Sequence, residues 1–153
     1  GLGALLGAIF LASRKTVLGL GRMIFVAVIL FGTGMVIFSL SRVLVISLLS
    51  LSLTGFGMMV HSVSTNTILQ TIVEDDKRGR MMSFFTLAFV GVAPFGSLLA
   101  GILAHQIGVP ATLFLIGVLC FLASFLFRRR LPLLRTLVRP IYLQKGILDR
   151  IPE

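Results

Sequence analysis

The sequence predicts an all-α membrane protein, a helical bundle with one partial and four complete transmembrane helices. Hydrophobic residues make up 57% of the 153 residues and charged residues only 12%, and the mean hydropathy is +1.08. One soluble core of this size cannot bury so much apolar surface. The stretch 43–73 carries no formal charge. A bilayer therefore suits these segments better than water does.

Apolar segments of helical length follow one another along the chain. A bilayer core about 30 Å thick needs roughly 20 helical residues to cross it. The first segment, Leu2–Ala12, is too short to cross, and because the chain opens inside it without Met we expect a truncated start. Complete spans are expected at residues 23–40, 43–72, 81–104 and 109–127. The second of these is long enough to tilt or to extend beyond the hydrocarbon.

Basic residues accumulate on one side of these spans. The first and third connections hold Arg14, Lys15, Arg22, Lys77, Arg78 and Arg80. Seven more lie after residue 127, whereas Arg42 is alone in the second connection, so thirteen of the fourteen basic residues fall on one side. Lys and Arg mark cytoplasmic loops, which predicts a multi-pass protein with a cytoplasmic C-terminus. Nucleic acid is not an expected partner, because the net charge of +9 is spread between apolar runs.

The charge distribution divides the chain into a membrane bundle at residues 1–127 and a basic cytoplasmic tail at residues 128–153. Apolar residues in the tail recur near helical spacing beside Arg135 and Arg139. This pattern indicates a helix lying on anionic membrane lipids, with disorder as the alternative. Pro132 and Pro140 argue that such a helix is short or broken.

The span 43–72 carries a stripe of small and polar residues at spacings of three or four, which place them on one helix face. They are Ser47, Ser50, Thr54, Gly57, His61 and Ser64. The stripe either packs closely against another helix or lines a path for substrate or protons.

Two side chains in this span are further candidates for function. His61 is the only ionisable side chain well inside the span. It either exchanges protons near neutral pH or stays neutral and bonds to a nearby hydroxyl. Asn66, near the basic side, is either a substrate contact or a paired or solvated residue.

Two further segments suggest moving parts. Gly91, Pro94, Gly96 and Gly101 in the span 81–104 indicate a kink or hinge, or else static close packing. The connection before that span holds Glu74, Asp75, Asp76, Lys77, Arg78 and Arg80. It is either a solvated turn or a charge latch that opens and closes between conformations.

No cofactor and no metal site are indicated. Cys120 is the single cysteine, so the chain cannot form an internal disulfide or a thiolate cluster. An intramembrane hydrolase would need His61 and Ser64 as base and nucleophile, but no glycine-flanked nucleophile motif surrounds Ser64. A membrane scaffold without transport activity would show the same spans and charges.

The run EDDKRGRMMSFFTLAFVGVAPFGSLLAG (74–101) resembles the tenth-to-eleventh helix region of major facilitator superfamily transporters, especially the bacterial exporter branch that includes siderophore exporters. Its RGRMMS segment is the most specific part. The run GALLGAIFLASRKTVLGLGR (3–22) resembles the end of helix eight with its basic loop.

The resemblance implies a C-terminal fragment of a twelve-helix transporter of the bacterial inner membrane, whose missing N-terminal half is its partner. It implies export of a small-molecule substrate by alternating access, driven by inward proton flux. By position, Arg14, Lys15, Arg78, Gly79 and Arg80 would belong to loops that control state switching. Pro94 and Gly96 would belong to a gating helix.

Overall fold

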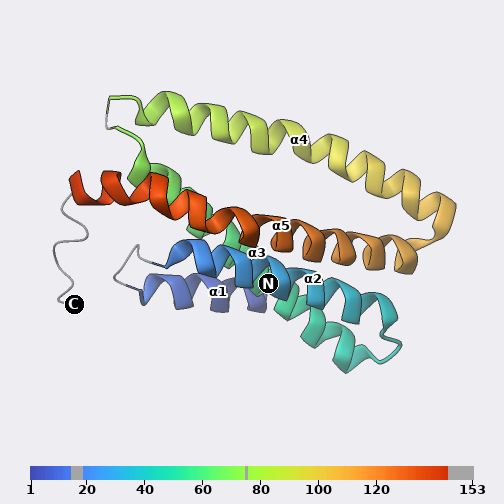
Figure 1. The fold of residues 1–153 in the computed structure, drawn as a ribbon. Helices are drawn as coiled ribbons and strands as arrows, with labels where there is room; N and C mark the ends of the chain where they lie inside the picture. The colour runs from blue at the N-terminus through green and yellow to red at the C-terminus, as the bar shows by residue number, and fades with distance from the viewer. Residues whose placement is uncertain (15–18, 75, 145–153) are drawn as a thin grey trace.

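A computed structural model of the chain describes residues 1–14, 19–74 and 76–144. They form five α-helices, which run back and forth as a bundle (Figure 1). The helices are α1 (Leu2–Ala12), α2 (Leu20–Leu40), α3 (Leu44–Ile72), α4 (Arg78–Ile107) and α5 (Val109–Gln144).

Four of these helices are long and apolar enough to cross a membrane: α2, α3, α4 and the part of α5 from Val109 to Leu134. The apolar helix α1 has 11 residues, about 17 Å, and is too short. The prediction of one partial and four complete membrane helices is therefore confirmed. The α2 and α4 helices each begin three residues before the predicted spans, because Arg22, Arg78 and Arg80 are accommodated in first turns that need not lie in the hydrocarbon.

Glycines bring the central helices into close contact. The α2 helix packs along α3 and also along α5, and α1 packs on α3. A Cβ added at Gly57 in α3 would lie 2.6 Å from the Ala27 carbonyl oxygen in α2. A Cβ added at Gly34 in α2 would lie 2.8 Å from the Ser50 carbonyl oxygen. Close backbone approach of this kind drives helix association in lipid, where water no longer favours burial.

The α4 helix stands at the edge of the bundle (Figure 1) and none of its residues is buried. It packs mainly against α5, to which it is joined through Gly108 alone, with φ 84° and ψ 155°. Glycines 91, 96 and 101 of α4 have nothing within 4 Å of an added Cβ. Neither static packing of these glycines nor a break at Pro94 is seen, since α4 is continuous from Arg78 to Ile107.

The α5 helix is longer than expected. It has 36 residues, about 54 Å, and contains both Pro132 and Pro140, so the expectation of a short or broken helix in the tail is wrong. Each proline frees only one carbonyl; Pro132 lies in the last turn of the membrane span, which ends at Leu134, and Pro140 lies beyond it. Residue 127 therefore falls inside a continuous helix, and an independent tail at residues 128–153 stays a prediction.

The end of α1, the start of α2, the end of α3 and the start of α4 lie at the same end of the bundle as the last turns of α5 (Figure 1). We call this the basic end. Arg22, Lys77 and Arg139 lie there, whereas Arg42 lies between α2 and α3 at the opposite end. The separation of charge expected from the loops is thus present in the folded chain.

Candidate functional site

The buried face of α3 is directed at α2. It consists of Ser50, Thr54, Gly57, Val60 and Ser64. Val60, which is 3% exposed, occupies this face in place of His61, which is half-buried beside it. The predicted stripe therefore consists of two parts. The first part, with Ser50, Thr54 and Gly57, is a surface that packs against α2.

The hydroxyls of this first part bond within α3. Ser50 Oγ donates to the Ser47 carbonyl oxygen at 2.9 Å, and Thr54 Oγ1 donates to the Ser50 carbonyl oxygen at 2.9 Å. Thr54 also lies where a Cβ on Gly34 would stand. In this conformation the two hydroxyls are buried in the contact between α2 and α3, and a solute cannot reach them.

The second part contains three buried polar atoms that have no hydrogen-bond partner among the described residues. They are His61 Nδ1, Ser64 Oγ and Thr65 Oγ1, and we call these three residues the polar cluster. Ser64 is 0% exposed. A buried polar atom without a partner costs about 1–3 kcal/mol. Atoms of this kind therefore need an explanation, and a bound ligand or a functional role is one such explanation.

The polar cluster lies near the middle of the membrane span. His61 is three residues beyond Met58, the central residue of α3, which corresponds to about 5 Å along the axis. Sequence analysis identified His61 and Ser64 but missed Thr65. The signal was present, because Thr65 follows His61 by four residues and shares its helix face. Asn66 is turned elsewhere, and its Oδ1 accepts a bond from Gln70 Nε2 at 2.9 Å.

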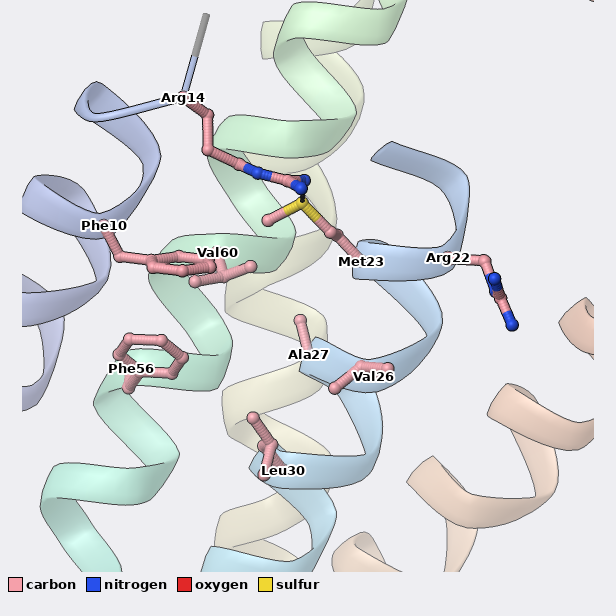
Figure 2. Close-up of a pocket in the computed structure, with 9 residues that line it drawn as sticks. All are labelled: Phe10, Arg14, Arg22, Met23, Val26, Ala27, Leu30, Phe56 and Val60. Carbon is pink, nitrogen blue, oxygen red and sulfur yellow. Dashed lines mark hydrogen bonds between the residues drawn. The ribbon is translucent and has the colours of Figure 1, made fainter. Parts of the chain in front are cut away.

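A cavity of about 240 Å³ separates α1, α2 and α3 toward the basic end (Figure 2). Its wall is mostly apolar and includes the tilted ring pair Phe10 and Phe56, with centroids 5.8 Å apart. Arg14 reaches across to the Met23 sulfur, whereas the side chain of Arg22, which also lines this cavity, points away from Phe10 and Val60 (Figure 2). Arg14 is therefore placed by contact with α2, and this predicted switch residue lines the cavity.

The other predicted switch residues lie on the surface. Glu74 and Lys77 form an exposed ion pair of 2.6 Å at the start of α4. Asp76, Arg78, Gly79 and Arg80 are also exposed there, while Lys15 and Asp75 lie outside the described residues. Helices α1 and α4 do not touch in the described part of the chain. Helix packing therefore does not bring Arg14 to the α4 group.

The two predicted gating residues lie near the middle of α4. Pro94 and Gly96 are both exposed, and the Pro94 carbonyl oxygen accepts a bond from Ser97 Oγ at 2.9 Å. Because Pro94 has no N–H, the carbonyl of Val90 loses its helical partner. This is a weak point of α4, although the helix does not break there.

The geometry does not assemble hydrolytic or metal chemistry. Among the described residues His61 Nδ1 and Ser64 Oγ have no hydrogen bond, so they do not bond to each other. The same part of the chain has no group of three His, Cys, Asp or Glu side chains that could hold a metal ion. The polar cluster is suited to hydrogen bonding and proton exchange.

Comparison with known proteins identifies the family. No curated protein and no solved structure matches the chain. The family model described as transmembrane secretion effector matches residues 1–138, which include α1 to α4 and the whole membrane span of α5. This is a family of transporters and not of enzymes. The chain therefore belongs to the transmembrane secretion effector family of the major facilitator superfamily.

Proposed function

We propose that this protein exports a small molecule across the bacterial inner membrane by alternating access, and that inward proton flow drives the export. Family membership supports export in general. The observation that carries the finer proposal is the polar cluster on α3, with its three unpartnered atoms near the middle of a membrane span.

The chemistry of the polar cluster fits this proposal. Imidazole is the side chain that exchanges a proton most readily near neutral pH. Ionisable groups inside membrane spans typically mark ion or substrate paths. Ser64 and Thr65 add hydroxyls that can donate and accept within one helical turn of His61. A proton or a polar solute can thus be passed along one side of α3.

The proposed transport unit contains more helices than the five described here. Helix α4 has no buried residue, although helices of a transporter normally pack on one another around a central site. We infer that these helices form the end of a twelve-helix bundle and that the other half packs against them. The basic end would face the cytoplasm by the positive-inside rule.

The substrate class rests on the sequence resemblance. The RGRMMS run at residues 78–83 resembles the exporter branch that includes siderophore exporters. Siderophores are therefore the first compounds to test, followed by other amphipathic small molecules.

The test is efflux by the full-length protein in proteoliposomes, with and without an imposed proton gradient. We expect the gradient to accelerate efflux and His61→Gln to abolish this acceleration while substrate exchange at equal pH continues. His105→Gln is the matched control, because His105 is the only other histidine and lies exposed in the last turn of α4.

Equal loss of acceleration in the two variants would refute a coupling role for His61. If no substrate moved under any gradient, the transport proposal itself would fail and a scaffold role would be favoured.

A further inference from the structure

A second cavity, of about 540 Å³, lies at the basic end between the first turn of α2, the last turns of α3 and the C-terminal part of α5. Its wall is largely aliphatic, with Ile68, Ile72 and Leu131 among the lining residues. Two arginines, Arg22 and Arg139, also line it, and no acidic side chain does. The cavity thus combines an apolar interior with positive charge.

Neither arginine has an interaction partner in the described part of the chain. Arg22 and Arg139 form no ion pair and no hydrogen bond there. By contrast, Arg128 lies over the Phe25 ring at 5.6 Å and Arg129 over the Phe125 ring at 4.7 Å. These two neighbours are engaged by aromatic rings, whereas the cavity arginines remain available to an anion.

Backbone and hydroxyl groups add to the positive character of this cavity. The α2 helix begins at Leu20, after Gly19, with no side-chain cap and no acidic residue in its first turn, so no described side chain compensates its first N–H groups and its positive helix end. Gly19 has nothing within 4 Å of an added Cβ, so the backbone at the start of α2 is uncovered at the cavity wall. Thr65 Oγ1, which is buried and unpartnered, belongs to a residue that lines the same cavity.

The cavity extends along α5 from the membrane span to residues beyond its end. The membrane span of α5 ends at Leu134, and α5 residues lining the cavity extend from Phe127 to Tyr142. The apolar part of the cavity is therefore next to the hydrocarbon, and its arginines are next to the membrane surface. A soluble anion would fit the arginines but would leave the aliphatic wall unused.

We propose that this cavity binds an anionic phospholipid, with an acyl chain along the aliphatic wall and the phosphate at Arg22 and Arg139. Basic pockets between transmembrane helices bind acidic headgroups in this way. The bound lipid joins α2, α3 and α5 at the basic end. The cavity shares Thr65 with the polar cluster, but the proposal rests on Arg22 and Arg139 and does not depend on proton coupling.

The test is native mass spectrometry of the full-length protein titrated with phosphatidylglycerol and, separately, with phosphatidylcholine. We expect tighter binding of phosphatidylglycerol. The double variant Arg22→Gln, Arg139→Gln is expected to weaken that binding about thirtyfold, from the usual effect of one basic residue on anionic lipid. Arg42→Gln is the control, because Arg42 is exposed at the opposite end of the bundle.

Two further experiments test the aliphatic wall of the cavity and whether the bound anion is a lipid or free phosphate. Val138→Trp fills the cavity without changing charge, and we expect it to weaken phosphatidylglycerol binding as well. Inorganic phosphate at the same concentration is expected not to displace the lipid. The proposal is overturned if both lipids bind equally, if the double variant matches Arg42→Gln, or if phosphate displaces the lipid. The melting temperature without lipid checks that each variant is folded.

Discussion

The contact between α2 and α3 at Gly57 can be tested by adding one methyl group. In Gly57→Ala the new Cβ would lie 2.6 Å from the Ala27 carbonyl oxygen and 2.8 Å from the Phe31 backbone nitrogen. Ordinary contact begins at 3.4 Å, so the helices must separate by about 0.8 Å. Both neighbouring atoms belong to the backbone, and no side-chain rotation can relieve the overlap.

Overpacking of this size costs about 1–3 kcal/mol. Alanine returns about 1 kcal/mol through its higher helix propensity, so we expect a net loss of up to about 2 kcal/mol. At about 2–4 °C per kcal/mol the melting temperature should fall by up to roughly 8 °C. The assay is thermal unfolding of the purified protein in detergent.

Gly91→Ala is the matched control, because an added Cβ there has nothing within 4 Å. It gains the same helix propensity without the overlap and should leave the melting temperature unchanged or raise it. If Gly57→Ala melted at the same temperature as Gly91→Ala, the close approach of α2 and α3 would be refuted.

Three further changes have defined outcomes. Gly108→Ala should destabilise the protein by about 1–3 kcal/mol, because its φ of 84° and ψ of 155° are strained for alanine; Gly101→Ala in thermal unfolding is the control. Lys77→Gln should change stability by less than about 1 kcal/mol, because its ion pair with Glu74 is exposed on both sides; a larger loss would indicate a latch. Burial raises the pKa of the Tyr142 phenol above 10.0, so the unfolded chain ionises first and stability should fall above about pH 10. Tyr142→Phe should flatten this decline in denaturant titrations at pH 8 to 11.

The membrane spans could be predicted from the sequence because a bilayer imposes length and hydropathy on each helix separately. The ends of α4 and α5 were less predictable. At α4 the basic residues were assigned to the loop, but they occupy the first helical turn. At α5, Pro132 and Pro140 suggested a break, but each frees only one carbonyl, and they lie at the end of the membrane span and beyond it, where the helix continues.

The candidate site was predictable only in part. Spacing placed Ser50, Thr54, His61 and Ser64 on one face, but a helix has 3.6 residues per turn, so a stripe of that length drifts around the axis. Which of its hydroxyls bond to their own helix depends on the position of α2, which sequence periodicity does not contain. Thr65, by contrast, could have been predicted, because it follows His61 by four residues on the same helix face.

The single-residue connection between α4 and α5 has a consequence for how the protein enters the membrane. Helix α4 is synthesised before α5, and Gly108 is the only residue between the two helices. The chain therefore has no loop there that could stay in water while α5 is completed. A helical hairpin that crossed the bilayer as one unit would carry His105 and Gln106 through the hydrocarbon at its tip. Basic residues stand at both open ends of this hairpin, Lys77, Arg78 and Arg80 at the start of α4 and the arginines that follow the α5 span, so both ends favour the same side of the membrane.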